Sequence, residues 1–198
     1  MDQAINAGLA LTCHARLALH GMASEVVAQG TILDVHHLLE ETVLDLCRGQ
    51  HLDLHYRTER PSLEQYLEMV RLKTGVLLGA ACETAALVAG TPNKRVAAKS
   101  FGEAPGVGFQ LRDDYLGVWG NPQEMGKNAG DLKDGKWSLP LLAVARQEGP
   151  NSSVPTAIDW MVDEWTRGAL GHLSEIGLPI DMHEMFLEVT QGLENRPA

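Results

Sequence analysis

Three polar side chains near the middle of the chain have the types and spacing needed to hold a divalent cation. Asp113 and Asp114 are adjacent carboxylates, and Gln110 precedes them by three residues in a segment of helical periodicity. Mg²⁺ prefers oxygen ligands and commonly uses one or two carboxylates together with water and phosphate oxygens. Short motifs have a high false-positive rate, however, and adjacent aspartates also occur on solvated helix surfaces. The pair alone leaves both interpretations open.

The residues around this pair favour the metal interpretation, because they are suited to a diphosphate. Residues 126–136, which follow the carboxylates, combine Lys127 and Lys136 with several glycines. Lysine binds phosphate as a point charge, and glycine lets the backbone approach a ligand closely. Upstream, Lys73 and Thr74 interrupt the apolar face of another predicted helix. A lysine in such a position either extends to the surface or meets an anion.

The elements that must position these residues are helices. Apolar residues recur at three- and four-residue intervals, and convincing strand alternation is absent. With 198 residues, of which 44% are hydrophobic, the chain can bury one sizeable core, so we predict an all-α bundle with a single domain over residues 1–198. The predicted helices cover about residues 32–47, 62–89, 93–119, 138–148, 155–174 and 181–193, with a polar loop over 121–137.

Local signals set some of the helix boundaries. Ser62 and Gln65 have the spacing of a capping box at the start of the second predicted helix. Gly90, followed by a proline two residues later, is a stop signal at its end. Pro105 lies inside the third predicted helix, where it removes a backbone donor and clashes with the preceding turn. We therefore expect a kink or break there, which affects how Asp113 is presented.

Composition excludes several classes of protein. The net charge of −10 argues against a nucleic-acid partner, because phosphate backbones require basic patches. No run of 18 apolar residues is present, so no membrane-spanning helix is expected. The N-terminus lacks the charge pattern of a signal peptide. Cys13, Cys47 and Cys82 are widely spaced, which fits reduced thiols, and a cytoplasmic location is predicted.

Four motifs together resemble one known family. Residues 109–140, FQLRDDYLGVWGNPQEMGKNAGDLKDGKWSLP, resemble the second aspartate-rich region of trans-isoprenyl diphosphate synthases, the polyprenyl synthetase family. Residues 49–54, GQHLDL, are similar to the family's GQxxDL segment, and Lys73-Thr74 to its KT pair. Asn6-Ala7-Gly8 is similar to the opening of an earlier family helix. The matches fall in the family's order over residues 6 to about 145, which implies a helical bundle of the isoprenoid synthase type.

The resemblance also implies a reaction and a role for each motif residue. The family ionises an allylic diphosphate, which isopentenyl diphosphate then attacks before a proton is lost, and the product serves isoprenoid biosynthesis. Asp113 and Asp114 would hold Mg²⁺ against the allylic diphosphate, with Gln110 beside the reacting atoms. Thr74 would help to stabilise the allylic cation. Diphosphate oxygens would be held by three lysines: Lys73, Lys127 and Lys136.

Two departures from the family pattern bear on activity. Gly117 occupies the third acidic position of the family's fuller motif, DDxxD, and glycine offers a metal no ligand. The family's first DDxxD motif, expected before Asn6, is absent, and no other Asp-Asp pair occurs. We therefore expect an N-terminally truncated bundle that keeps the allylic half of the site and lacks the isopentenyl half.

This absence leaves two alternatives to a trans-prenyltransferase. One is a non-catalytic, diphosphate-binding subunit or remnant of such a synthase, and the other is a diphosphate-ionising terpene cyclase, which needs only one substrate. A partial bundle also leaves apolar helix faces uncovered. We therefore predict a homodimer, or a hetero-oligomer with a related subunit.

Overall fold

Helices are the only regular secondary structure in the described part of the chain, as predicted. The computed structural model describes residues 2–22, 27–119, 137–138 and 153–194. The elements, in order, are α1 (Asp2–Gly21), α2 (Gln29–His55), α3 (Leu63–Val70), the π-helical turn η1 (Arg71–Gly75), α4 (Val76–Val88), the 3₁₀ turn η2 (Pro92–Lys94), α5 (Arg95–Trp119), α8 (Ser153–Ile176) and α9 (Ile180–Glu194). None of these helices has the length and hydropathy needed to cross a membrane.

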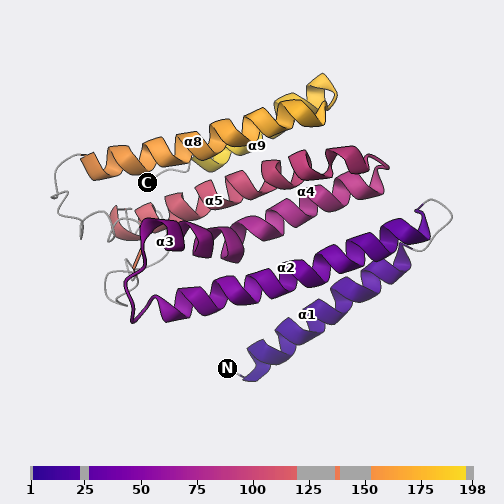
Figure 1. Cartoon of the computed structure of the whole chain (residues 1–198), viewed down its shortest axis with the longest axis horizontal. Helices are drawn as coiled ribbons and strands as arrows, with labels where there is room; N and C mark the ends of the chain where they lie inside the picture. Colours follow the sequence, from indigo (N-terminus) through magenta and orange to yellow (C-terminus); the bar gives the residue numbers. More distant parts are fainter. Residues whose placement is uncertain (1, 23–26, 120–136, 139–152, 195–198) are drawn as a thin grey trace.

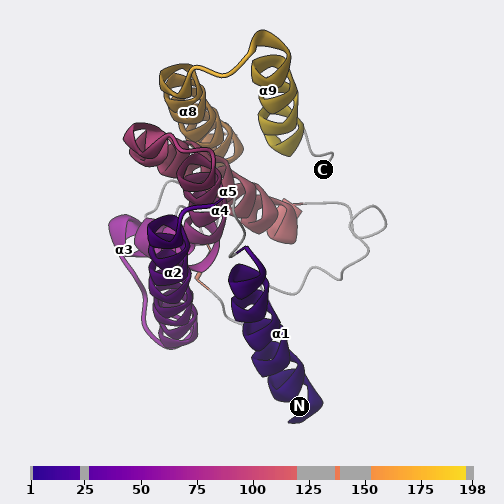
Figure 2. The same ribbon diagram turned by 90° about the vertical axis from the view of Figure 1, so that its right-hand side faces the viewer.

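The helices form a row in which α5 occupies a central place. Figure 1 shows α1 beside α2, then α4, α5 and α8 in succession, with α9 packed on α5 and α8. The most extensive contacts join α5 to α4 on one side and to α8 on the other. Figure 2 shows α1 and α9 standing out from this row on the same side. A residue of α5 can therefore reach several elements at once.

Three clusters of buried apolar side chains hold the row together. The cluster that underlies α3, α5 and α8 includes Tyr66, Met69, Val70, Val107, Leu111, Ile158 and Val162. A second cluster joins α2 to α4, and a third joins α5 to α8 and α9. Burial of a large apolar side chain contributes roughly 1.5–3 kcal/mol. The first cluster is therefore a rigid support for the α3–α5 contact.

Most of the predicted boundaries within the described residues are correct. Ser62 caps α3 through the predicted box: the N–H of Gln65 donates to Ser62 Oγ (3.1 Å), and the N–H of Ser62 donates to Gln65 Oε1 (2.8 Å). The run that begins there ends at Val88, just before Gly90. The helices predicted over 155–174 and 181–193 correspond to α8 and α9. Nearly all of the predicted helix over 138–148 and of the predicted loop over 121–137 lies outside the described residues.

Of the kink or break expected at Pro105, the break does not occur, because α5 runs as one helix from Arg95 to Trp119. Pro105 still costs one backbone hydrogen bond, since it has no N–H to donate to the carbonyl of Phe101. Packing against α4 and α8 outweighs that loss. The neighbouring glycines serve this packing: a Cβ atom on Gly102 would overlap the carbonyl group of Leu78 and lie 2.9 Å from Cys82 Sγ. They therefore allow a close helix crossing where the sequence suggested an interruption.

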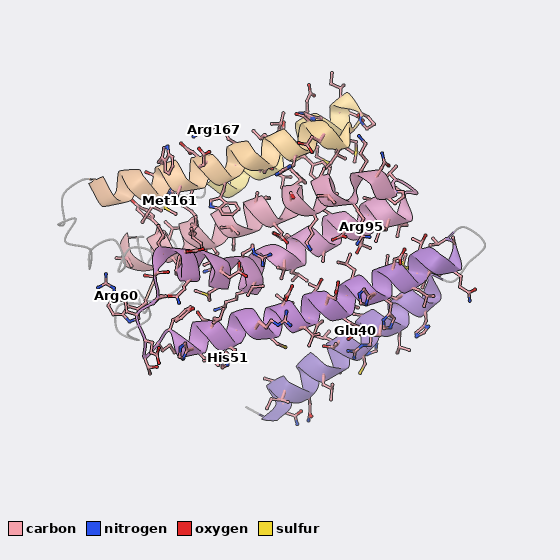
Figure 3. All side chains as sticks on the ribbon, viewed as in Figure 1. Glu40, His51, Arg60, Arg95, Met161 and Arg167 are labelled. Carbon is pink, nitrogen blue, oxygen red and sulfur yellow. The ribbon has the colours of Figure 1, made fainter. Side chains whose placement is uncertain are left out.

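Helix α1 lies at the edge of the row and is held mainly by α2. Arg16 Nε donates to Glu40 Oε1 (2.6 Å), and Arg16 Nη2 donates to Glu40 Oε2 (2.9 Å). Glu40 lies on α2 next to α1 in Figure 3, and its hydrogen bond from Arg16 lowers the pKa of the carboxyl group. The apolar side chains of α1 that remain exposed are Ile5, Leu9, Leu11 and Leu17. This helix therefore presents an uncovered apolar surface.

We expect Gly102→Ala to lower the free energy of unfolding by about 1–3 kcal/mol, because the added methyl group must push α4 and α5 apart. Gly171→Ala is the matched control. Gly171 lies within α8 with no atom close to its Cβ position, so alanine there should stabilise the helix by about 0.5–1 kcal/mol. Chemical denaturation of both variants measures the difference. Equal effects at the two positions would contradict the close crossing.

Candidate active site

Four of the predicted site residues lie where a π-helical turn meets α2 and α5: Lys73, Thr74, Gln110 and Asp114. The turn η1, with sequence RLKTG, interrupts the run from α3 to α4 and carries Lys73 and Thr74. Turns of this kind often occur at functional sites. The two side chains leave η1 in different directions: Lys73 contacts α2, whereas Thr74 contacts α5. The turn thus connects two helices that are far apart in sequence.

Lys73 meets an anion, which is one of the two predicted outcomes for this lysine. Its Nζ atom lies 2.8 Å from Oδ2 of Asp53 on α2. The carboxylate is buried, whereas the lysine side chain is 28% exposed. Gly49 makes this contact possible, because a Cβ atom there would overlap the backbone of Lys73. The ammonium group is thus anchored by Asp53, in a side chain that remains partly exposed.

A chain of hydrogen bonds links Thr74 to Tyr66 through α5. Thr74 Oγ1 donates to Gln110 Oε1 (3.1 Å), and Gln110 Nε2 donates to Asp114 Oδ1 (2.9 Å). The hydroxyl of Tyr66 on α3 donates to the other carboxylate oxygen, Asp114 Oδ2 (2.6 Å). Tyr66 and Asp114 are almost completely buried. Because buried charges require such partners, these hydrogen bonds explain how the Asp114 carboxylate can lie inside the bundle.

The two adjacent aspartates therefore have different surroundings. Asp113 is half-buried, whereas only 2% of Asp114 is exposed. Within the described residues no group of three or more acidic, histidine or cysteine side chains could enclose a metal. Mg²⁺ does not need such an enclosure, because it keeps waters and accepts phosphate oxygens beside one or two carboxylates. Asp113 thus fits as a ligand of Mg²⁺ bound together with a diphosphate, whereas both oxygens of the buried Asp114 already accept hydrogen bonds from protein groups.

Two of the predicted lysines, Lys127 and Lys136, lie outside the described residues. The residue that follows them, Trp137, packs against the cluster that contains Tyr66. The guanidinium carbon of Arg60 lies 5.4 Å from the centre of the Trp137 ring, and Figure 3 labels Arg60 near the start of α3. Trp137, which directly follows Lys136 in the sequence, therefore lies beside Arg60 near the start of α3.

Two contributors to the site, Tyr66 and Asp53, cannot be recognised as site residues from the sequence alone. Tyr66 belongs to an apolar helix face, where a tyrosine is ordinarily a core residue, and nothing local connects it with Asp114 across 48 residues. Asp53 lies within the GQxxDL segment, which by itself indicates no role for this residue. The sequence would identify an acidic residue as the partner of a lysine only if the pairing of their two helices were already known.

Other charged contacts stabilise the turn and its neighbours. The Nε–H group of Arg71, the first residue of η1, donates to Glu68 Oε2 (2.8 Å), and this hydrogen bond lowers the pKa of the Glu68 carboxyl group. Glu83 on α4 is buried and paired with Arg95 Nη2 on α5 at 2.6 Å. Burial raises the pKa of the Cys82 thiol, so this group is a poor nucleophile.

Comparison with known proteins agrees with this arrangement. The structure resembles a geranylgeranyl pyrophosphate synthetase from the archaeon Geoglobus acetivorans, with a TM-score of 0.86 over 99% of this chain and 67% of that chain, at 24% identity. It also resembles a polyprenyl synthase from Caulobacter crescentus, solved with calcium and isoprenyl diphosphate, with a TM-score of 0.71 and 26% identity over 83% of this chain and 60% of that one.

Sequence comparison gives the same result. Heptaprenyl diphosphate synthase component 2 from Geobacillus stearothermophilus is 36% identical over 123 residues, which cover 60% of this chain and 38% of that protein. The chain spans less than half the length of the curated relatives it matches. The profile of one family, described as polyprenyl synthetase, matches residues 1–158. This chain belongs to the polyprenyl synthetase family.

Proposed function

We propose that the protein is a trans-prenyltransferase that joins an allylic diphosphate to isopentenyl diphosphate and forms a longer polyprenyl diphosphate. The observation that carries the proposal is the hydrogen bond between Thr74 and Gln110. It joins two motifs that lie 36 residues apart and brings a hydroxyl, an amide and the aspartate pair to one place. These groups suit a site where a diphosphate departs and a cation forms beside it.

In this proposal each residue has a distinct task. Mg²⁺, when bound, would neutralise charge on the departing diphosphate. Asp113, with Asp114 behind it, would hold the metal. Lys73 would contact diphosphate oxygens from its accessible side while Asp53 fixes its position. By sequence, Lys127 and Lys136 would supply further positive charge; their place in the site is a proposal from the motif alone.

The names of the relatives support the same class of reaction. The Geobacillus stearothermophilus relative is a heptaprenyl diphosphate synthase component, and the Caulobacter crescentus structure contains calcium and isoprenyl diphosphate. A divalent cation and a prenyl diphosphate are the ligands that Asp113 and Lys73 would bind here. The word "component" in the first name also supports the alternative of a subunit that acts within a larger assembly.

The test is turnover by the purified chain with Mg²⁺, labelled isopentenyl diphosphate and a panel of allylic diphosphates, with a chelator as the blank. We expect chelator-sensitive extension products. Asp113→Ala and Lys127→Ala should each weaken Mg²⁺-dependent binding of the allylic diphosphate by about 2–5 kcal/mol, because each removes a charged contact that is desolvated in the complex.

Asp34→Ala is the matched control for these variants, since Asp34 is an exposed carboxylate on α2. Calorimetry measures the binding, and circular dichroism verifies the fold. Binding unchanged in both Asp113→Ala and Lys127→Ala would overturn the proposed site. Mg²⁺-dependent binding without turnover would favour the non-catalytic subunit. Release of diphosphate without isopentenyl diphosphate would favour the cyclase.

Lys73 should affect stability and binding separately. Lys73→Met removes the ammonium group beside the buried Asp53, so we expect a loss of about 2–3 kcal/mol in unfolding free energy; the exposed side of the lysine keeps the loss below that of a fully buried pair. Adding Asp53→Asn should restore part of this stability without restoring diphosphate binding. Asp45→Asn, which disrupts an exposed pair with Arg48 on the same helix, should change stability by less than about 0.5 kcal/mol. Recovery of binding in the double variant would exclude direct contact between Lys73 and the diphosphate.

For partners, we propose that the chain associates with another chain of the same family through the apolar surface of α1. Ile5, Leu9 and Leu17 are each more than 60% exposed there. Apolar surface of this kind usually marks an interaction site. Sedimentation should detect an oligomer of the wild-type chain, and Leu9→Asp should shift it towards monomer. A wild-type monomer that binds no apolar dye would contradict this assembly.

A further inference from the structure

We propose that Tyr66 is a positioning residue that sets, through Asp114 and Gln110, the direction in which the Thr74 hydroxyl points. The inference rests on the proposed function only for its consequence in turnover. The hydrogen-bond chain from Tyr66 to Thr74 crosses α3, α5 and η1 and uses four side chains. Tyr66 lies at the end farthest from the predicted chemistry.

The hydrogen bonds in this series all run in one donor-to-acceptor direction from Thr74 to Asp114, and Asp114 determines that direction. A carboxylate anion only accepts hydrogen bonds. The side-chain amide of Gln110 can therefore face Asp114 only with its NH₂ group, which donates to Oδ1 at 2.9 Å. Its carbonyl oxygen must then point away from Asp114, and it accepts from Thr74 Oγ1 at 3.1 Å. Because the Thr74 hydroxyl proton is committed to this bond, the lone pairs of its oxygen face elsewhere.

That orientation matters for the proposed reaction. An oxygen that presents lone pairs stabilises a developing allylic cation, whereas a hydroxyl that presents its proton repels it. Reversing the Gln110 amide would place its NH₂ group against Thr74 and would free the hydroxyl to turn. Asp114 thus controls a group two hydrogen bonds away without touching it.

Tyr66 is required because Asp114 is buried. Its hydroxyl donates to Oδ2 at 2.6 Å, from a side chain with no exposed surface. Removing the donor of a buried hydrogen bond leaves a desolvated acceptor, which is costly for a charged group. Packing of Tyr66 with Val107 and Leu111 fixes the position of its ring. Tyr66 can therefore hold the carboxylate in the rotamer that faces Gln110.

The first test observes the side-chain amide of Gln110 directly, in the full chain and without substrate. The Gln110 side-chain NH₂ resonances are identified by nuclear magnetic resonance from their loss in Gln110→Met. We expect these resonances to shift in Tyr66→Phe and their hydrogen exchange to become faster. Tyr56→Phe is the matched control, because Tyr56 is a buried tyrosine of the same cluster. Unchanged Gln110 resonances in Tyr66→Phe would overturn the proposal.

The second test is a double-mutant cycle on turnover. Loss of a residue that supports a ligand-contacting group commonly costs about 10- to 100-fold in activity. We expect Tyr66→Phe to lower kcat in that range while KM for the allylic diphosphate changes by less than about threefold. In a Thr74→Val background the same change should cost little more, because the group that Tyr66 controls is already absent. Additive losses, or an equal loss in Tyr56→Phe, would show a merely structural role and overturn the proposal.

The two tests separate this proposal from the proposed function. If the wild-type chain shows no turnover, the prenyltransferase proposal fails for this chain, and the Gln110 resonances alone decide the role of Tyr66. A shift in Tyr66→Phe, absent from Tyr56→Phe, would then still support positioning. If turnover is present but the resonances do not respond, the proposed function stands and the role of Tyr66 is refuted.

Discussion

The close crossing of α4 and α5 is the constraint on which the site depends. A Cβ atom on Gly106 would lie 2.8 Å from the Cα atom of Gly75, so the two backbones approach as only glycine permits. This contact involves the last residue of η1, directly after Thr74. If the helices were further apart by the width of one methyl group, Thr74 could not reach Gln110. The site therefore depends on these two glycines, which have no side chains, as much as on the side chains that form its hydrogen bonds.

Buried carboxylates then fix how the helices align. Asp53 on α2 is held by Lys73 of η1, and Asp114 on α5 by Tyr66 of α3. Glu83 on α4 is held by an arginine of α5. Each charge is satisfied only when two particular elements lie in one register, since a shifted neighbour would leave it desolvated and unpaired. Apolar clusters hold the helices together, whereas these pairs select one arrangement among many.

Much of this could be predicted from the sequence, because the signals were local. The capping box at Ser62 and the motif containing Lys73 need only a few neighbouring residues to be recognised. The continuity of α5 through Pro105 could not be predicted, since it depends on packing against α4 and α8. The partners of Asp114 were equally inaccessible. Apolar periodicity shows that a helix face is buried, but it does not show which polar atom lies opposite.

The π-helical turn also determines the direction, around the helix axis, in which the side chains that follow it point. Tyr66 and Thr74 are eight residues apart, and in a regular α-helix they would point about 80° apart around the axis. A π turn holds one extra residue, so the pair behaves as if seven residues apart and differs by only about 20°. Both side chains can then face α5, where Asp114 and Gln110 receive them. If η1 were regular α-helix with all of its residues kept, α4 would be rotated by roughly 100° relative to α3, and the two ends of the hydrogen-bond chain would no longer share a face.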